Sequence, residues 1–320
     1  MDSARRIPAA VVLSVLAAFS PCAFALNPAL DIFQYTHKAW TVREGFFKGS
    51  WITAIAQTPD GYLWLGTELG IVRFDGVRFV QWEPPSGEHL PSNQIRKLLV
   101  SRDGRVWIGT RQGLASWKDG KVNQHPELDG QAVGRLLEDH EGTVWVGSWG
   151  VPTGRLCAIQ NDTVHCYGQD GVLGRGVWGL HEDTKRNLWV GVSDGLWRWI
   201  PGPSRFYPMP GESDAIRAFI ENDNHELLIS TRKGIKRFVD GKTEAYPPLE
   251  NISGSRGESM LRDRDGGLWI STSDRGLIHV HQSRADVFAH NDGLSDDEAD
   301  RKSTRLNSSH SGESRMPSSA

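Results

Sequence analysis

The sequence predicts an all-β protein, a β-propeller of four-stranded antiparallel blades. Three observations predict it. A tryptophan-centred octapeptide recurs about every 40 residues, and apolar runs of four to seven residues surround each copy. Glycine-containing turns separate these runs, and the chain has 35 glycines in 320 residues. A period near 40 with several short strands per unit is typical of propeller blades.

The first 25 residues are predicted to be a secretory signal peptide. Arg5 and Arg6 precede an apolar run at residues 7–19, and an Ala-Phe-Ala cleavage motif ends at Ala25. The run is too short for an ordinary membrane span, so we expect a mature chain from Leu26. The residues before Cys22 form a poor lipobox, which disfavours a lipid anchor.

The repeat organises the rest of the chain. Clear copies occupy residues 60–67, 103–110 and 141–148, and degraded copies occupy 186–191, 225–231 and 265–272. The tryptophan position, held by leucine in the fifth copy, recurs after 38 to 44 residues. Six units are therefore present, and they end near residue 289.

The first unit shows how each repeat supplies four strands, expected at residues 52–58, 62–67, 70–74 and 77–82. Asp-Gly pairs at 60–61 and 75–76 separate them, and such pairs favour type I′ turns with positive φ at both central residues. The second strand is apolar on both faces, as expected for a strand between two blades. The repeated tryptophan should therefore pack between blades.

These residues carry a family resemblance. The pattern Asp-Gly-x-Leu/Val-Trp-Leu/Ile/Val-Gly-Thr, followed three residues later by Gly-Ile or Gly-Leu, resembles the two-component regulator propeller repeat, and so does Trp-Thr-Val-Arg-Glu-Gly at residues 40–45. The resemblance covers about residues 31–295, although the third to fifth units depart by an insertion or by lost Gly and Trp. It implies a propeller outside the inner membrane, followed in the parent protein by a membrane helix and an output module.

The resemblance implies an extracytoplasmic ligand-sensing propeller of a two-component signal-transduction protein, acting by binding. Its parent is expected to be a sensor histidine kinase of a phosphorelay, anchored in the inner membrane and homodimeric. Two alternatives stay open: the sensor of a diguanylate cyclase, and a free-standing periplasmic propeller with streptogramin-lyase-like activity. No enzyme is expected in the residues present, because nucleotide-loop and hydrolase motifs are missing.

Charge and composition limit the partners. The formal charge is -3, from 36 basic and 39 acidic residues, with no basic run, so nucleic acid is not expected. We expect a small-molecule ligand, with carbohydrates among the candidates, or a periplasmic protein. No cofactor or metal is expected. His279 and His281 share a strand face, but no third ligand accompanies them.

Candidate ligand contacts follow from topology. Loops that join the second strand to the third, and one blade to the next, share one face of a propeller. The residues expected there are Trp51, Glu68, Arg111, Trp149, Asp194, Arg232 and Arg275. Trp149 stands in the longest loop, residues 148–153, and would be either an aromatic platform for a sugar or apolar group, or a packing residue beneath its own loop.

The two cysteines outside the signal are expected to face each other. If Asn161 and Asp162 form a two-residue turn, counting outward pairs Cys157 with Cys166. Directly opposed antiparallel residues lie within disulfide range, and the periplasm is oxidising. The sequence therefore predicts a disulfide, with two buried thiols as the alternative.

The domain plan is a signal peptide at 1–25, an incomplete propeller at 26–299 and a disordered tail at 300–320. The tail resembles a translated sequencing adapter, although a natural Ser-rich tail has similar composition. Residues 31–35 look like a fourth strand without its own blade, and 291–295 like the start of a seventh unit. We therefore expect a fragment with six repeats of a seven-bladed ring, whose open edge favours aggregation.

Overall fold

The computed structural model describes residues 50–150, 152–200, 202–209, 215–222, 224–231, 233–252, 257–263, 266–281, 284–292 and 294. The chain divides into two compact units, Met1–Trp40 and Thr41–Ala320, and every described residue belongs to the second. The predicted signal peptide, the predicted strand at 31–35 and the predicted tail all lie outside the described residues.

The described strands form six four-stranded antiparallel sheets, as the sequence predicts, and each sheet is one blade. Blades 1 to 3 consist of β1 (Ile52–Gln57), β2 (Leu63–Thr67), β3 (Gly70–Phe74), β4 (Phe79–Trp82); β5 (Ile95–Val100), β6 (Val106–Thr110), β7 (Gly113–Lys118), β8 (Lys121–His125); and β9 (Ala132–Glu138), β10 (Val144–Trp149), β11 (Leu156–Gln160), β12 (Thr163–Tyr167).

Blades 4 to 6 repeat this meander. They consist of β13 (Gly179–Glu182), β14 (Leu188–Gly191), β15 (Gly195–Ile200), β16 (Arg205–Pro208); β17 (Phe219–Glu221), β18 (Leu227–Thr231), β19 (Gly234–Val239), β20 (Lys242–Ala245); and β21 (Gly257–Arg262), β22 (Leu268–Thr272), β23 (Leu277–His281), β24 (Arg284–Phe288). Three short 3-10 helices complete the described elements: η3 (Pro126–Leu128), η4 (Pro247–Ile252) and η5 (His290–Asp292).

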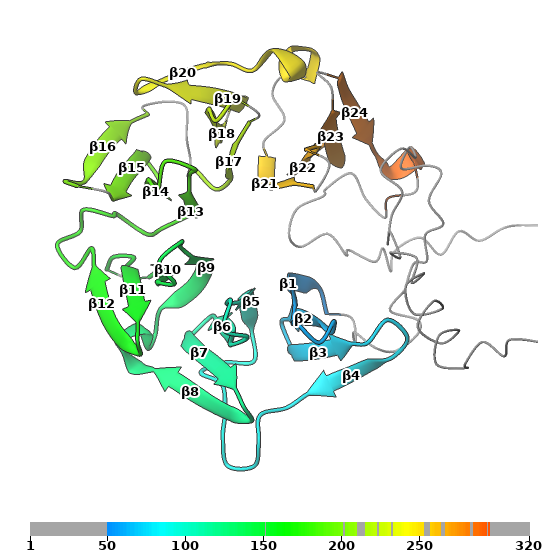
Figure 1. Ribbon diagram of the computed structural model, residues 1–320, viewed down its shortest axis with the longest axis vertical. Coiled ribbons are helices and arrows are strands. Elements are labelled where there is room, and N and C mark those ends of the chain that lie inside the picture. Colours follow the sequence, from blue (N-terminus) through cyan, green and yellow to red (C-terminus); the bar gives the residue numbers. More distant parts are fainter. Residues whose placement is uncertain are drawn as a thin grey trace, which may run out of the picture. The chain divides into compact units, whose positions relative to one another are not determined.

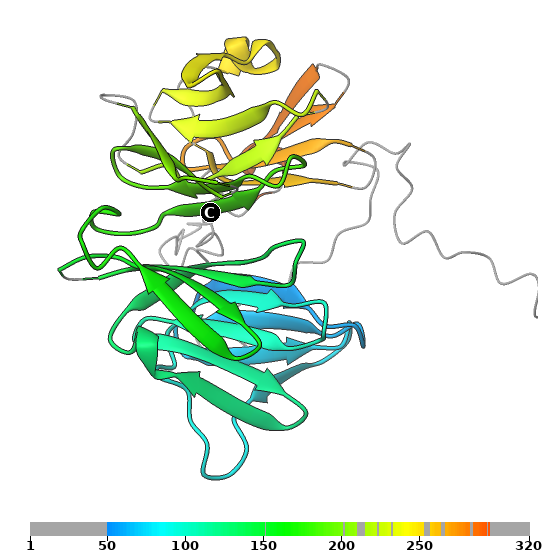
Figure 2. The ribbon, with the colours of Figure 1, turned by 60° about the vertical axis from the view of Figure 1, so that its left-hand side comes forward.

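The blades stand in a ring with the first strand of each innermost (Figure 1). Neighbouring blades pack through these inner strands, from β1 to β5, β9, β13, β17 and β21 in turn. The turned view in Figure 2 shows the blades as stacked, twisted sheets. This is the β-propeller that the repeat period predicts.

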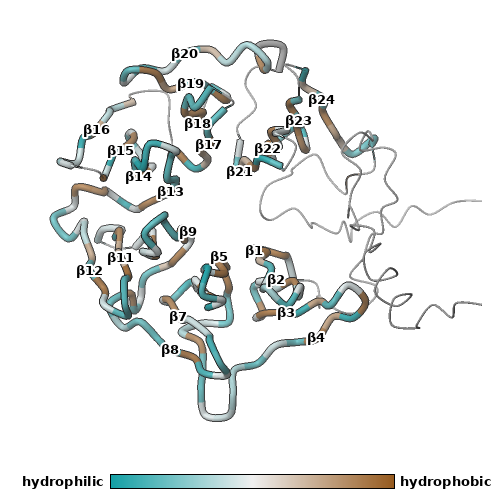
Figure 3. The backbone as a smooth tube through the Cα atoms, in the orientation of Figure 1, coloured by the Kyte–Doolittle hydropathy of each residue, from teal (hydrophilic) through white to brown (hydrophobic). Residues whose placement is uncertain are grey.

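The hydrophobic core is divided among the interfaces between blades. Each of the five clusters of buried residues joins one blade to the next, and hydrophobic stretches occur in every blade (Figure 3). In the first interface Trp64 packs with Ile95, Leu98 and Ile108 of blade 2. Trp64 is 1% exposed. The prediction that the repeated tryptophan packs between blades is confirmed for Trp64, Trp107, Trp145 and Trp189, whereas Trp269 of blade 6 is half-buried and lies in none of the five clusters.

A hydrogen bond fixes each of these tryptophans to its own hairpin. The indole Nε1–H donates to a side-chain oxygen six residues earlier, where a Thr, Ser or Asp stands. The acceptors, in chain order, are Thr58, Ser101, Asp139, Asp183 and Asp263, at 3.2, 3.1, 2.8, 2.8 and 2.8 Å. A buried indole therefore has a partner, as its polar N–H requires.

The turns correct one detail of the sequence analysis. Gly61 has φ of 88°, but Asp60 is not among the residues with positive φ, so the predicted type I′ turn there is wrong. Gly61 N–H instead donates to Thr58 O at 2.8 Å, and Thr58 N–H donates to Tyr62 O at 3.0 Å. This pattern fits a tight turn closed by one left-handed glycine. Gly76 also has a positive φ, whereas Asp75 before it does not.

The flanks of blades 1 and 6 differ from the other interfaces. Ile55 of β1 pairs with Leu65 and is 62% exposed, whereas Leu98, at the same place in blade 2, is 2% exposed against blade 1. Leu261 of β21 is 65% exposed on the opposite flank. Among the described strands no packing comparable to the other interfaces joins β21 to β1. Among the described residues, these two flanks therefore each carry an exposed apolar side chain.

Candidate functional site

The two faces of the ring carry different connections. The loop face holds the loops that join second to third strands and one blade to the next, and the turn face holds the hairpin turns that join first to second and third to fourth strands. At the loop face the inner strands carry a bulge: the register skips one residue in blades 1, 2, 3 and 6. The residues at this place, in blade order, are Thr53, Arg96, Gly134, Trp178, Arg217 and Glu258.

Two tryptophans meet at this inner rim. Trp149 ends β10 in blade 3, and Trp178 directly precedes β13 in blade 4. Their rings stack with centroids 5.4 Å apart and planes 11° apart, and both side chains are half-buried. Trp178 Nε1–H donates to Ser193 Oγ at 3.1 Å, which fixes its ring. The stack offers a flat apolar surface with a defined orientation.

Two glycines make room for this stack. A Cβ on Gly134 would lie 2.0 Å from the Trp149 ring, and one on Gly176 would lie 2.5 Å from Trp149 Cβ. Trp149 also forms an isolated antiparallel bridge with Gly176. Any larger residue at either position would displace the ring. The local sequence therefore holds Trp149 at the rim rather than leaving it free in its loop.

A charged pair continues the row across blades 5 and 6. The Arg217 guanidinium lies 5.6 Å from the centroid of the Trp178 ring. Its Nη1 donates to both oxygens of Glu258, at 3.3 and 3.0 Å. The side chains of Arg217 and Glu258 are 32% and 15% exposed. Aromatic, cationic and anionic groups thus follow one another along one rim, an arrangement that can stack a ring and bind hydroxyl groups.

The residues predicted from topology lie apart around the loop face. Glu68 and Arg275 are exposed, and Glu68 N–H donates to Ser50 Oγ at 3.1 Å. Arg111 donates from its backbone to Gln94 O at 3.0 Å, and Asp194 O accepts from Met209 N–H at 2.9 Å. No hydrogen bond, ion pair or ring contact joins these four described residues to one another.

Trp149, Trp178, Arg217 and Glu258 form a row of side chains at the inner rim, called the rim row below. Of the residues predicted from topology, only Trp149 belongs to it. Trp51 lies just before β1 in blade 1, and Arg232 lies outside the described residues. That any of the predicted residues contacts a ligand stays a prediction. Trp178, Arg217 and Glu258 were not predicted from the sequence. Alignment of the repeats could have found them, because they share one position relative to the motif.

The cysteines lie in the outer part of blade 3. The hairpin of β11 and β12 pairs Cys157 with Cys166, with Cα atoms 4.0 Å apart, and the two form a disulfide. Asn161 and Asp162 both have positive φ, at 49° and 60°. The bond faces blade 2, since both cysteines pack in the cluster that joins blades 2 and 3.

The described residues contain neither a cluster of metal-ligating side chains nor a membrane-spanning helix. Within the described ranges no group of three or more His, Cys, Asp or Glu side chains could hold a metal ion. His279 stacks on His281 with centroids 5.9 Å apart, and its Nε2 lies 3.6 Å from Asp263. No helix in the described part is long and apolar enough to cross a membrane.

A model of a known protein family matches three segments of the chain. The two-component regulator propeller family matches residues 47–68, 89–112 and 127–150, which contain the three clear repeats. A search of curated protein sequences finds no significant match.

Solved structures share the fold. Extracellular domains of two hybrid two-component systems from B. thetaiotaomicron match with TM-scores of 0.64 and 0.61, at 21% and 19% identity. Each match covers 78% of this chain, which spans 36% and 35% of those longer chains. Virginiamycin B lyase from Staphylococcus aureus matches with a TM-score of 0.57 at 14% identity, over 75% of this chain and 84% of the lyase.

Proposed function

The chain carries the repeats of the two-component regulator propeller family, and from this premise we propose that it is the ligand-sensing propeller of a two-component signal-transduction protein. It acts by binding a small molecule on the loop face. The parent protein, of which this propeller is one part, is a membrane-anchored sensor, with a histidine kinase as the output that the family favours.

The observation that carries the proposal is the stacked pair Trp149 and Trp178. Two half-buried indoles at one rim form a platform for the apolar face of a sugar ring or for another flat group. Arg217 and Glu258 beside them supply a donor and an acceptor for polar groups of the same ligand. A small carbohydrate therefore suits the rim, because it combines an apolar ring face with hydroxyl groups.

The proposed location is the periplasm. The predicted signal peptide would export the chain, and the Cys157–Cys166 disulfide suits an oxidising compartment. Fusion of residues 1–299 to a reporter that is active only after export tests this. We expect reporter activity that is lost when residues 1–25 are removed. Equal activity of both fusions would contradict an exported chain.

Ligand binding is tested by titration with a panel of neutral oligosaccharides. We expect at least one to bind the wild-type chain, and the Trp149→Ala and Trp178→Ala variants to bind it at least about fivefold more weakly, because a stacked ring contributes about 1 kcal/mol or more. Tyr167→Ala is the matched control, because Tyr167 is a 40% exposed aromatic on the outer strand of the same blade. If only the Tyr167→Ala variant lost binding, the rim would be excluded as the ligand-binding site.

A lyase is the second candidate, favoured by the extent of its structural match. The chain covers 84% of the S. aureus virginiamycin B lyase, against about a third of the two-component domains. Incubation of the chain with quinupristin, the ligand in one structure of that lyase, tests the activity. Enzyme-dependent loss of quinupristin, followed by chromatography, would establish the lyase and overturn a purely sensory role.

A further inference from the structure

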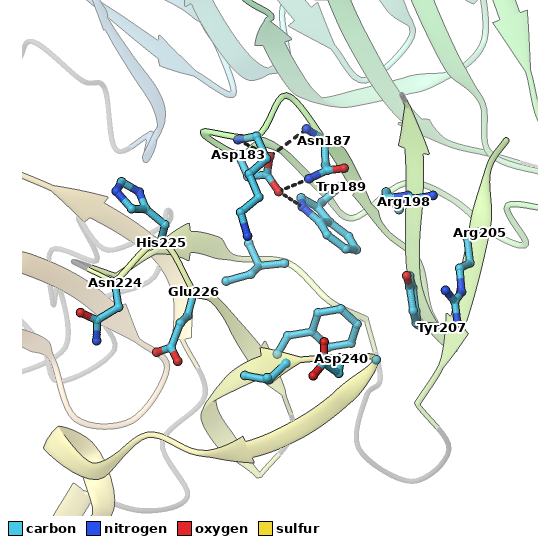
Figure 4. A pocket seen from close by; sticks show the side chains of 15 residues that line it. Asp183, Asn187, Trp189, Arg198, Arg205, Tyr207, Asn224, His225, Glu226 and Asp240 are labelled. Carbon is cyan, nitrogen blue, oxygen red and sulfur yellow. Dashed lines mark hydrogen bonds between the residues drawn. The ribbon is translucent and has the colours of Figure 1, made fainter. Parts of the chain in front are cut away.

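A cavity of about 510 Å³ opens on the turn face between blades 4 and 5, away from the rim (Figure 4). Blade 4 contributes the turn at 183–187 together with Arg198, Arg205 and Tyr207, and blade 5 contributes the turn at 224–226 together with Phe238 and Asp240. The volume lies in the range of small-molecule sites.

Three carboxylates line the cavity, and two of them, Asp183 and Glu226, are already engaged. Asp183 accepts from the backbone N–H groups of Lys185 and Asn187 at 2.9 and 2.8 Å, and from Trp189 Nε1–H at 2.8 Å. Glu226 accepts from Asn222 Nδ2 at 2.6 Å and from the Arg237 guanidinium at 3.0 Å. The hydrogen bond from Asn222 lowers the pKa of Glu226. Asp183 and Glu226 are therefore held by groups of the protein itself, and the third carboxylate, Asp240, is exposed to solvent.

The cations at the same wall are not engaged. Arg198 and Arg205 stand directly opposite each other on β15 and β16, although like charges at opposed positions are destabilising. Within the described residues the Arg198 guanidinium and the Lys185 ammonium have no hydrogen bond or ion pair, and Arg198 Nε is buried. Arg205 only covers the Tyr207 ring, at 4.9 Å.

The other blades show that this is an exception. The residue equivalent to Arg198 is Arg237 in blade 5, where strand 4 supplies Glu244 opposite it and Glu244 pairs with it at 3.0 Å. In blade 1 the equivalent residue is Arg73, which lies 3.8 Å from Asp60 in its own turn. In blade 4, Arg205 stands at the position that Glu244 holds in blade 5. Lys185 stands at the position that Asp60 holds in blade 1, so both acids are replaced by basic residues.

We propose that this cavity binds an organic carboxylate whose charge lies between Arg198 and Arg205. An arginine guanidinium presents a fork of donors that matches a carboxylate, and a bound anion would relieve the repulsion between the two arginines. The cavity is far larger than a bare carboxylate, and Tyr207, Phe238 and Leu227 supply apolar wall beside the charge. The ligand therefore carries a flat or apolar body.

Calorimetric titration of the chain with sodium benzoate, sodium acetate and sodium phosphate at constant ionic strength tests the proposal. Benzoate should bind the wild-type chain more tightly than acetate or phosphate does. The Arg198→Gln and Arg205→Gln substitutions should each weaken benzoate binding at least tenfold. Arg205 is exposed, so its substitution should not disturb the fold. Arg73→Gln, the equivalent change in blade 1, should leave it unchanged. Absence of benzoate binding, equal loss in Arg73→Gln, or tighter binding of phosphate would overturn the proposal.

A second variant tests the charge argument without any ligand. Arg205→Glu recreates in blade 4 the Arg237–Glu244 pair of blade 5. We expect the melting temperature to rise by about 1 to 3 °C at low salt, and benzoate binding to be lost. An unchanged or lower melting temperature would show that the two arginines do not repel each other in the free protein, and would remove the basis of the site.

Discussion

Single polar residues decide how the repeated tryptophan is held. Asp139 is 3% exposed, and its carboxylate accepts from Glu141 N–H at 3.0 Å, from Thr143 N–H at 2.9 Å and from Trp145 Nε1–H at 2.8 Å. One side chain thus closes the hairpin turn and orients the indole between blades. A buried donor that loses such an acceptor costs free energy, because water cannot replace it.

We expect Asp139→Ala to lower the free energy of unfolding by about 2 to 4 kcal/mol, measured by urea denaturation, because three donors lose a charged acceptor. Asp139→Thr should recover part of this, since Thr58 accepts the indole N–H at the same position of blade 1. Asp170→Ala is the control, because Asp170 accepts one exposed backbone N–H at 3.2 Å. Equal losses in Asp139→Ala and Asp170→Ala would contradict this reading.

Two histidines, the buried His125 and the half-buried His181, make stability depend on pH. Burial lowers the pKa of both His125 and His181 below the usual value. As the pH falls, the two histidines are therefore protonated at a higher pH in the unfolded chain than in the folded protein. The stabilisation is present above about pH 6.5, the unfolded value, and is lost as the pH falls toward the lower pKa of the folded state.

The free energy of unfolding should decrease between pH 7 and pH 5, by at most about 1.4 kcal/mol per pH unit for each histidine. His125→Gln should flatten this dependence. The variant keeps a polar group near Ser116 Oγ, which lies 3.2 Å from His125 Nε2. Urea denaturation at a series of pH values measures the slope, and the same slope in wild type and variant would contradict burial as its cause.

Hairpins are the elements that the sequence predicts best. In the hairpin of β11 and β12 a two-residue turn sets the register, so counting outward pairs Cys157 with Cys166. The turn at Asp60 and Gly61 was predicted wrongly, because an Asp-Gly pair suits both a type I′ turn and a turn with one left-handed glycine. Local chemistry fixes pairing once the turn type is known.

The rim row was beyond such local reasoning. Trp149, Trp178, Arg217 and Glu258 come from four blades, so their contacts depend on how blades stack rather than on strand pattern. The position that Trp178, Arg217 and Glu258 share follows from strand register, not from the hydrophobic alternation, and in blade 6 it is the residue that the bulge skips. The opposed arginines of blade 4 could not be predicted in this way either. They stand out only when they are compared with the arginine–acid pairs at the equivalent positions of blades 1 and 5.

Reduction of the disulfide tests how far this hairpin supports the fold. The bond closes a short loop, with cysteines nine positions apart in sequence. We expect dithiothreitol to lower the free energy of unfolding by about 2 to 3 kcal/mol. A Cys157→Ser, Cys166→Ser double variant should show no response to the reductant. The account of the hairpin fails if wild type is equally insensitive while mass spectrometry shows that the bond is reduced.

At the scale of the whole molecule, stability comes from contacts between neighbours. Five clusters join six blades, so each interior blade is covered on both sides. Ile55 and Leu261 occupy positions whose counterparts lie within those clusters, yet both are exposed. Exposed apolar strand surface is a site of association.

We expect Ile55→Gln with Leu261→Gln to reduce self-association, measured by light scattering, with less than about 0.5 kcal/mol change in stability, since both side chains already face solvent. Leu98→Gln, the blade 2 counterpart of Ile55, should cost about 3 kcal/mol or more, because Leu98 is 2% exposed. A similar cost for Ile55→Gln would show that its flank is covered in solution.

We propose that the loop face near the axis binds the ligand of the sensor. Hydrogen–deuterium exchange of the chain, with and without a saturating oligosaccharide from the titration panel, would locate this binding. We predict slower exchange at residues 132–135, 149–150, 176–179, 215–219 and 257–259, and unchanged exchange at the hairpin turns of the opposite face. Protection confined to those turns, or no protection at the five rim segments, would contradict the claim.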